Sequence, residues 1–152
     1  MSNLEKTLIT GITGFIGGEL AHRLLEEGHE VFGFVQHVVG RDWKSLEDIK
    51  DKVHFITCDI RDYFSVRNAI KEVNPHQVFH LAALSPVRLS FDLPFDFQQS
   101  NYLGTINVAE AIRELNNPEM RLVAASTAEV YGFQEEKPTS EEVRLEPSSP
   151  YA

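Results

Sequence analysis

Thr10-Gly11-Ile12-Thr13-Gly14-Phe15-Ile16-Gly17 is the stretch that decides the fold of this chain. An apolar run long enough for a buried strand precedes it at residues 7–9, and apolar residues at helical spacing follow it over residues 16–25. A strand, a glycine-rich turn and a helix in that order are the context in which Gly-x-x-Gly-x-x-Gly predicts dinucleotide binding. The alternative is a tight strand-to-helix turn that binds no ligand.

Each glycine of the stretch has its own expected part in such a site. Gly11 would let the chain turn sharply, Gly14 would let the backbone approach a pyrophosphate, and Gly17 would let the helix pack closely on the strand. The N–H groups at the start of the helix would face the phosphates. The cofactor-binding residues predicted in this stretch are Gly11, Thr13, Gly14, Phe15, Ile16 and Gly17.

Strands and helices alternate along the rest of the chain. Further strands are predicted at residues 31–35, 53–57, 77–81 and 122–125, and helices at residues 63–73 and 94–115. Ser45 is expected to cap a short amphipathic helix through Asp51, and Gly28 to end the first helix in a left-handed conformation. The alternation predicts an α/β fold with a doubly wound parallel sheet of the Rossmann type, in which residues 1–152 form one NAD(P)-binding domain.

Composition narrows the class of protein. The 152 residues carry a net charge of −9, which argues against nucleic acid and against anionic membrane surfaces as partners. No run of about 18 apolar residues occurs, and the first residues lack the build of a signal peptide. Cys58 is the single cysteine, which fits a reducing compartment. These features predict a cytoplasmic protein without a membrane span.

The end of the second strand bears on the choice of cofactor. A carboxylate at this point would accept a hydrogen bond from the adenosine ribose and would favour NAD. The chain has Val35-Gln36-His37 instead, and Arg41 follows in the next loop. We therefore expect NADP rather than NAD, with Gln36 and Arg41 near the 2′-phosphate. The alternative is that Arg41 is only a solvated loop charge.

Two more sets of cofactor-binding candidates follow the third and fourth strands. Asp59 could accept a hydrogen bond from the adenine amino group, with Ile60 beside it, or could cap the next helix. Leu81-Ala82-Ala83 would let the backbone lie against the cofactor, or would serve close packing alone. His80 is interpreted as a structural histidine.

Side chains of catalytic types follow the fifth strand. Ser126-Thr127-Ala128-Glu129-Val130-Tyr131-Gly132 places two hydroxyls, a carboxylate and a phenol together, and Ser149-Pro150-Tyr151 comes close to the last residue. The alternative is a polar turn in which Glu129 faces water and Tyr131 packs.

Taken in order, these motifs resemble the extended short-chain dehydrogenase/reductase family, the NAD(P)-dependent epimerases and dehydratases of nucleotide sugars. Asn101-x-x-Gly104-Thr105, on the long predicted helix, belongs to the ordered set. Within the family, the chain is most similar to the GDP-mannose 4,6-dehydratases, notably through Ser85-x-Val87-x-x-Ser90-Phe91-Asp92-Leu93. This resemblance implies a lyase that converts GDP-mannose to GDP-4-keto-6-deoxymannose through transient oxidation at C4 by bound NADP.

The resemblance also implies roles for single residues. Tyr151 would lie against the cofactor and take the proton from the sugar 4-hydroxyl, Thr127 would hydrogen-bond the same oxygen, and Glu129 would remove the C5 proton as water leaves C6. Ser85 is a candidate contact at the site, or a loop cap, and no metal ligand is implied. A 4-epimerase, a 4-keto-sugar reductase and a non-catalytic NADP-binding module stay open as alternatives.

Two departures from the family pattern carry expectations of their own. The family's Tyr-x-x-x-Lys motif would place a lysine four residues after Tyr151, beyond Ala152, with the substrate-binding portion after it. We therefore expect a fragment or part of a longer protein, inactive alone, that forms a homo-oligomer at full length. Gln36 and His37 stand where the dehydratases usually carry a basic residue.

Overall fold

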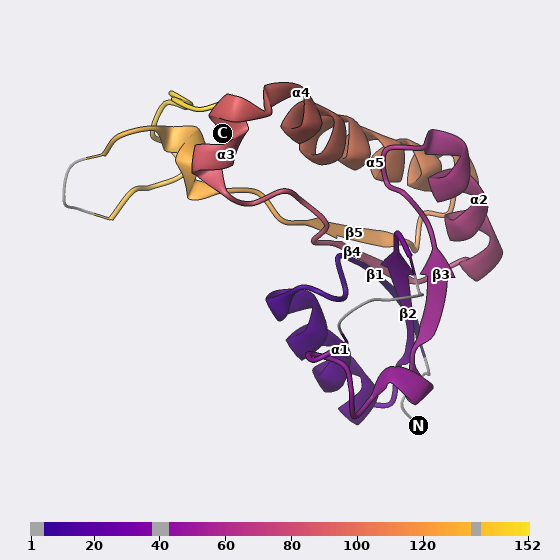
Figure 1. Ribbon diagram of the computed structural model, residues 1–152. Coiled ribbons are helices and arrows are strands. Elements are labelled where there is room, and N and C mark those ends of the chain that lie inside the picture. The colour runs from indigo at the N-terminus through magenta and orange to yellow at the C-terminus, as the bar shows by residue number, and fades with distance from the viewer. Residues whose placement is uncertain (1–4, 38–42, 135–137) are drawn as a thin grey trace.

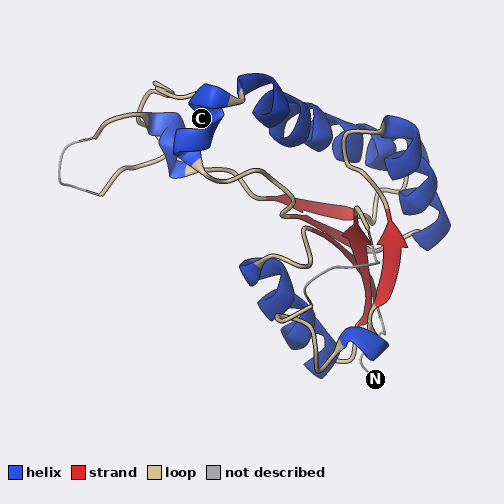
Figure 2. Ribbon diagram, in the orientation of Figure 1, coloured by secondary structure: helices blue, strands red, loops and turns tan. Residues whose placement is uncertain are grey.

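Five strands form one parallel sheet in a computed structural model, which describes residues 5–37, 43–134 and 138–152. Their spatial order is β3-β2-β1-β4-β5, so the direction of winding reverses between β1 and β4. This confirms the predicted fold class of a doubly wound α/β sheet. Figure 2 shows the strands in red and the helices in blue. The strands are β1 (Lys6–Thr10), β2 (Glu30–Val35), β3 (His54–Thr57), β4 (Gln77–His80) and β5 (Arg121–Ala124).

Helices cover both faces of the sheet, which explains why its central strands are apolar at consecutive positions. Leu8 of β1 belongs to the core on the face of α2 (Tyr63–Val73) and α5 (Gly104–Leu115). The next residue, Ile9, belongs to the core on the opposite face, beneath α1 (Phe15–Glu26; Figure 1). Among the helices described, none is long and apolar enough to cross a membrane.

The turn from β1 into α1 is built around two places where only glycine fits. Gly11 has a φ of +74°, and a Cβ there would lie 2.7 Å from the backbone nitrogen of Ala82. A Cβ on Gly17 would lie 2.3 Å from the carbonyl oxygen of Gly11. The N–H of Gly14 donates to that same carbonyl oxygen at 2.9 Å, which closes the turn. The first glycine therefore brings β1 against the loop after β4, and the third brings α1 against β1.

The ends of α1 and α2 follow from local sequence signals. Gly28 has a φ of +87°, and its N–H and that of His29 donate to carbonyls in the last turn of α1, which is the Schellman arrangement. At the start of α2, the Asp62 side chain accepts a hydrogen bond from the N–H of Phe64, and the helix ends at Asn74 in the left-handed region. The prediction for Gly28 is confirmed, and the predicted bounds of α2 match the observed ones.

Two predicted helices differ from the structure. The helix expected from Ser45 through Asp51 is wrong, because the segment forms consecutive turns and a short 3-10 helix, η1 (Lys50–Lys52). The Ser45 hydroxyl donates to the carbonyl of Thr13 at 3.4 Å. The single helix expected at residues 94–115 consists of α4 (Pro94–Phe97), a π-helical segment η2 (Gln98–Leu103) and α5. Two further elements were not predicted: α3 (Val87–Asp92) and the 3-10 helix η3 (Ala128–Tyr131).

The space around Gly17 and around Gly14 predicts that an alanine at the first position destabilises the fold more than an alanine at the second. Gly17→Ala should lower the free energy of unfolding by at least about 2 kcal/mol, because its Cβ would overlap backbone that cannot move aside. Gly14→Ala is the matched control: its Cβ would meet only the carbonyl oxygen of Gly11, at 3.2 Å, so the loss should stay under about 1 kcal/mol. Urea denaturation of both variants measures the difference, and equal losses would contradict the steric account.

Candidate functional site

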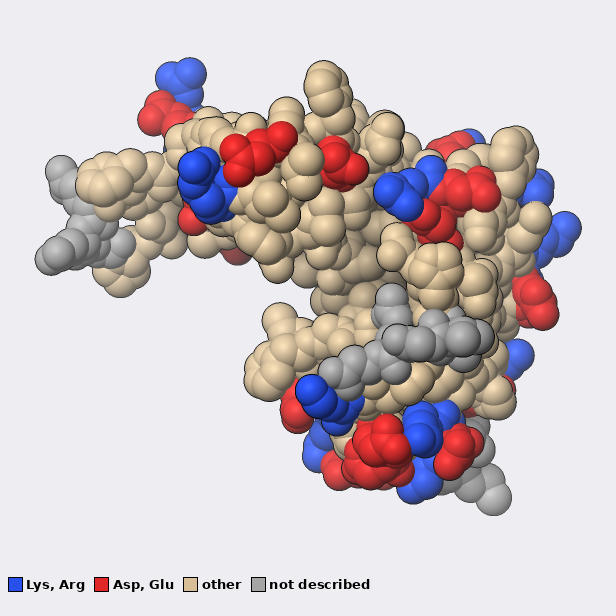
Figure 3. All heavy atoms as spheres, in the orientation of Figure 1, with Lys and Arg blue, Asp and Glu red and all other residues tan. Residues whose placement is uncertain are grey.

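A cavity of about 320 Å³ lies at the carboxyl ends of four strands, where the winding of the sheet reverses. This is the place where doubly wound sheets bind ligands, and the volume is that of a small-molecule site. Figure 3 shows this side of the molecule hollowed between the part holding α1 and the part holding α3. The cavity is lined by Gly11, Thr13, Gly14, Phe34, Val35, Gln36, Cys58, Ile60, Leu81, Ala82, Ala83, Leu84 and Ser100.

Eight of the predicted cofactor-binding residues are brought together in this lining: Gly11, Thr13, Gly14, Gln36, Ile60, Leu81, Ala82 and Ala83. Five lining residues were not predicted as binding residues: Phe34, Val35, Cys58, Leu84 and Ser100. Leu84 directly follows the predicted run at 81–83 and could have been included. Ser100 lies on the π-helical segment, and the regular helical pattern gave no signal for it.

The remaining predicted cofactor residues lie outside the lining. Phe15 and Ile16 are exposed at the start of α1, while Gly17 is buried within the turn. Ser85 is exposed beyond Leu84. Arg41 falls outside the described residues. The roles proposed for these residues stay predictions.

The lining contains no charged side chain among the residues that the structure describes. An anionic ligand must therefore find its stabilisation elsewhere in the cavity wall. The first N–H groups of α1, directly after Gly14, have no acceptor within the helix and carry its partial positive charge. The phosphate groups of a dinucleotide fit this end of the cavity, because the wall at Gly11 and Gly14 is bare backbone.

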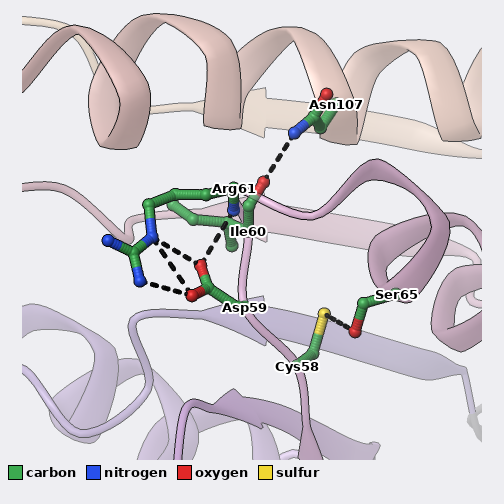
Figure 4. A network of polar contacts seen from close by, with 6 residues as sticks. All are labelled: Cys58, Asp59, Ile60, Arg61, Ser65 and Asn107. Atoms are coloured by element: carbon green, nitrogen blue, oxygen red, sulfur yellow. Dashed lines mark hydrogen bonds and ion pairs between the residues drawn. The ribbon is translucent and has the colours of Figure 1, made fainter. Parts of the chain in front are cut away.

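The loop after β3 is held in place by a network of polar contacts (Figure 4). The Asp59 carboxylate accepts hydrogen bonds from Nε and Nη2 of Arg61 and from the backbone N–H of Arg61, at 2.6 to 3.1 Å. The Arg61 guanidinium is the main reason why the pKa of Asp59 lies below its usual value. The carboxylate predicted to meet adenine is therefore ionised and already oriented by a neighbour, beside the cavity rather than in its lining.

Cys58 lines the cavity, but its thiol is not poised as a nucleophile. It is buried, and the hydroxyl of Ser65 donates to its sulfur at 3.5 Å (Figure 4). Burial raises the pKa of the thiol to about 11, so the protonated form prevails at neutral pH. Cys58 thus contributes an apolar wall to the site.

His80 is the buried centre of a hydrogen-bond chain behind the cavity wall. The Thr10 hydroxyl accepts from the N–H groups of Leu81 and Ala82, at 3.2 and 3.1 Å, so its own proton points to Nδ1 of His80 at 2.7 Å. Nε2 of His80 then donates to the Thr105 hydroxyl at 3.0 Å, which in turn donates to the carbonyl of Asn101 at 2.6 Å. Each hydroxyl or ring proton in this series of hydrogen bonds therefore has its own acceptor, and the His80 ring is the neutral Nε2–H tautomer.

The predicted catalytic residues lie beyond the end of β5. The Thr127 hydroxyl accepts a hydrogen bond from the N–H of Glu129 at 3.2 Å and caps η3, which leaves its own proton free to donate. Glu129 is exposed on the first turn of η3. Tyr151 is half-buried, and its ring stands edge-on to Phe97 with the ring centres 6.2 Å apart. None of the three lines the cavity.

The described part of the chain contains no evident metal-binding site. No group of three or more His, Cys, Asp or Glu side chains lies there in positions that could hold a metal ion.

Comparison with known proteins places this cavity in context. A family model described as GDP-mannose 4,6 dehydratase matches residues 8–152. The UDP-glucose 4-epimerase of Mycolicibacterium smegmatis is 39% identical over 149 residues, which is 97% of this chain and 47% of that protein. The GDP-mannose 4,6-dehydratase of Vibrio cholerae is 37% identical over 160 residues, which covers 99% of this chain and 42% of that protein.

Solved structures of nucleotide-sugar epimerases share the fold of this chain. A UDP-glucose-4-epimerase from Stenotrophomonas maltophila, with bound NAD and formylated UDP-arabinopyranose, matches with a TM-score of 0.84 and 29% identity over 97% of this chain and 44% of that one. The UDP-glucose 4-epimerase of Thermus thermophilus in complex with NAD matches with a TM-score of 0.83 and 34% identity, over 96% and 46% of the two chains. The chain thus spans somewhat under half the length of these relatives.

Folding shifts the pKa values of His80 and His22 in opposite directions. Burial lowers the pKa of His80 to about 4, while hydrogen bonds to the Gly18 carbonyl and to Asp48 raise that of His22 above 6.5. In an NMR titration, the ring signals of His80 should stay those of the Nε2–H tautomer from pH 8 to about 5, and those of His22 should move with a midpoint above 6.5. A His80 midpoint near 6.5 would contradict the buried neutral ring.

The same shift of His80 sets the sign of its effect on stability. Because its pKa falls from 6.5 to about 4 on folding, the unfolded chain binds more protons between those pH values. The contribution of His80 is therefore fully retained above pH 6.5 and is lost progressively as the pH falls toward 4. Because the raised pKa of His22 acts with the opposite sign, the test uses a His22→Gln background, in which urea denaturation should give a lower free energy of unfolding at pH 5.5 than at pH 7.5.

Proposed function

The chain belongs to the GDP-mannose 4,6-dehydratase family, and from that premise we propose that it is the NAD(P)-binding part of a nucleotide-sugar 4,6-dehydratase whose substrate is GDP-mannose. The match of the family model over residues 8–152 is the observation that carries the proposal. It includes both the glycine turn and the group formed by Thr127, Glu129 and Tyr151. In this proposal residues 1–152 are one cofactor-binding domain, and the sugar is bound by parts of the protein that the relatives have beyond it.

NADP is the proposed cofactor. Bound NADP would accept a hydride from C4 of the sugar and later return one to C6. The cavity supports a dinucleotide through the bare backbone at Gly11 and Gly14 and through the first N–H groups of α1. The neutral Gln36 lines the cavity at the end of β2, where a carboxylate would repel a 2′-phosphate. Against this stand the NAD-bound epimerases among the solved structures, so the choice between the two cofactors needs a direct measurement.

Two side chains would perform the proton transfers, and a third would orient the sugar. Tyr151 would take the proton from the sugar 4-hydroxyl as the hydride leaves C4. Thr127 would donate a hydrogen bond to the same oxygen, for which its proton is free. Glu129, exposed on η3, would then remove the C5 proton, which the new 4-keto group makes acidic, as water leaves C6.

A nucleotide-sugar 4-epimerase is the second candidate, favoured by the 39% identity to the epimerase of Mycolicibacterium smegmatis. An epimerase would use the Tyr151 and Thr127 pair in the same way. It has no elimination step, however, and therefore no need of a base at Glu129. The role of Glu129 thus separates the two candidates.

Cofactor preference can be measured on the chain itself. NADPH should bind about tenfold or more tightly than NADH, because Gln36 stands at the end of β2 in place of the carboxylate that favours NAD, and the nearby Asp59 carboxylate is already paired with Arg61. Gln36→Asp places a carboxylate at this point and should reverse the preference. Calorimetric titration of both cofactors tests this, and equal affinities in the unmodified chain would refute the assignment of NADP.

The catalytic proposal needs a protein in which this chain is joined to a substrate-binding portion. There, Glu129→Gln should still form reduced cofactor on mixing with GDP-mannose, while elimination slows by roughly 10²–10⁴-fold, because only the second proton transfer loses its base. Tyr151→Phe should prevent the first hydride transfer, so that no reduced cofactor appears. Single-turnover absorbance of the reduced nicotinamide distinguishes the two.

Glu142→Gln is the matched control, since Glu142 is an exposed glutamate in the same region that has no part in the proposed chemistry. It should leave both steps unchanged. Normal product formation by Glu129→Gln would make the epimerase the better candidate, and turnover of UDP-glucose to UDP-galactose would then be measured next.

A further inference from the structure

The π-helical segment η2 carries an asparagine that holds one wall of the cavity. The side-chain oxygen of Asn101 accepts from the N–H of Leu84 at 2.8 Å, and its side-chain nitrogen donates to the carbonyl of Leu84 at 2.9 Å. Leu84 lines the cavity, and so does Ser100, the neighbour of Asn101 on η2. One amide thus satisfies both backbone groups of a residue in the loop after β4.

A second asparagine on the same helical run holds the opposite wall. The side-chain nitrogen of Asn107, on α5, donates to the carbonyl of Ile60 at 2.8 Å (Figure 4). Ile60 lines the cavity on the side of β3, which is separated from β4 in the sheet by two strands, β2 and β1. The run from Gln98 to Leu115 therefore contacts the loops on both sides of the cavity.

Neither asparagine is explained by the helix itself. Asparagine is a poor residue for a helix interior, because its side chain competes for backbone hydrogen bonds. Asn101 and Asn107 cap no helix, and their side-chain partners lie 17 and 47 residues away in the chain. A π-helical turn is rare and tends to occur at functional sites. Thr105, which lies between them, binds His80 behind the same wall.

From these contacts we propose that Asn101 and Asn107 are positioning residues that set the two halves of the cofactor cavity independently. The inference rests on the proposed dinucleotide binding and adds which residues shape each half. In a doubly wound sheet the adenosine lies toward the end of β2, so Ile60 and Asn107 belong to the adenosine half. Leu84 and Asn101, across the switch point, belong to the half that receives the nicotinamide.

Two ligands of different length can test the two halves of the cavity separately. ADP probes only the adenosine half and the pyrophosphate, whereas NADPH probes the whole cavity. Asn101→Ala should weaken NADPH binding by about tenfold, the effect of losing two ordinary hydrogen bonds, and should change ADP binding less than about twofold. Asn107→Ala should weaken NADPH and ADP by the same factor. A general loss of stability would lower both affinities in both variants, so the split is specific to positioning.

Asn117→Ala is the matched control, because the Asn117 side chain also bonds a backbone group, the N–H of Glu119, but far from the cavity lining. It should leave both affinities unchanged. Should Asn101→Ala fail to fold, Asn101→Asp keeps the acceptor for the Leu84 N–H and should show the same split with a smaller loss of NADPH affinity. Dissociation constants come from calorimetry, with urea denaturation of each variant alongside.

The outcomes separate this inference from the proposal beneath it. If the unmodified chain bound neither NADPH nor NADH, the proposed function itself would fall. If it bound NADPH but Asn101→Ala lowered ADP and NADPH affinity alike, or changed neither, the assignment of Asn101 to one half would be overturned. Equal behaviour of Asn107→Ala and Asn117→Ala would overturn the assignment of Asn107.

Discussion

The approach of two backbones, Gly11 after β1 and Leu81-Ala82 after β4, is the contact on which the rest of this structure depends. A Cβ at Gly11 would come within 2.9 Å of three backbone atoms there, so the two strand ends meet without any side chain between them. The Thr10 hydroxyl fixes the same place from behind, by accepting the N–H groups of Leu81 and Ala82. The cavity lies just beyond the carboxyl ends of β1 and β4, so its position follows from the contact between the two loops that begin there.

The burial of His80 is a consequence of the same contact. Its ring connects Thr10 of β1 with Thr105 of α5, so the sheet and the helix above it are joined by hydrogen bonds as well as by apolar packing. Such a buried polar chain is stable because each donor in it has an acceptor. This explains why His80, at the end of a strand and beside the cavity, has a structural role and not a catalytic one.

Local patterns predicted the strands, α1, α2 and the glycine turn, because each of these depends on the residues within it. Apolar periodicity and the signals at Gly28 and Asn74 suffice for their type and ends. The segment after Ser45 forms turns in place of the predicted helix, and its Ser45 hydroxyl contacts Thr13, a residue distant in sequence. The π-helical segment escaped because residue types that favour a helix do not distinguish a π-helical turn from an α-helical one. Ser100 joins the cavity through that segment, so no pattern in the sequence marks it, whereas Leu84 is marked only by its position after the predicted run at 81–83.

The walls of the cavity bear on how enzymes of this kind diverge. Much of the lining at Gly11, Ala82 and Ala83 is main chain, whose shape is kept by side chains that stand behind it, such as Thr10, His80 and Asn101. Under the proposed function, mutations that alter the sugar-binding surface beyond β5 would leave these supports untouched. A lineage can then exchange one sugar nucleotide for another while inheriting its cofactor pocket unchanged. The TM-score of 0.84 at 29% identity to an epimerase shows that this frame is kept while most of the side chains differ.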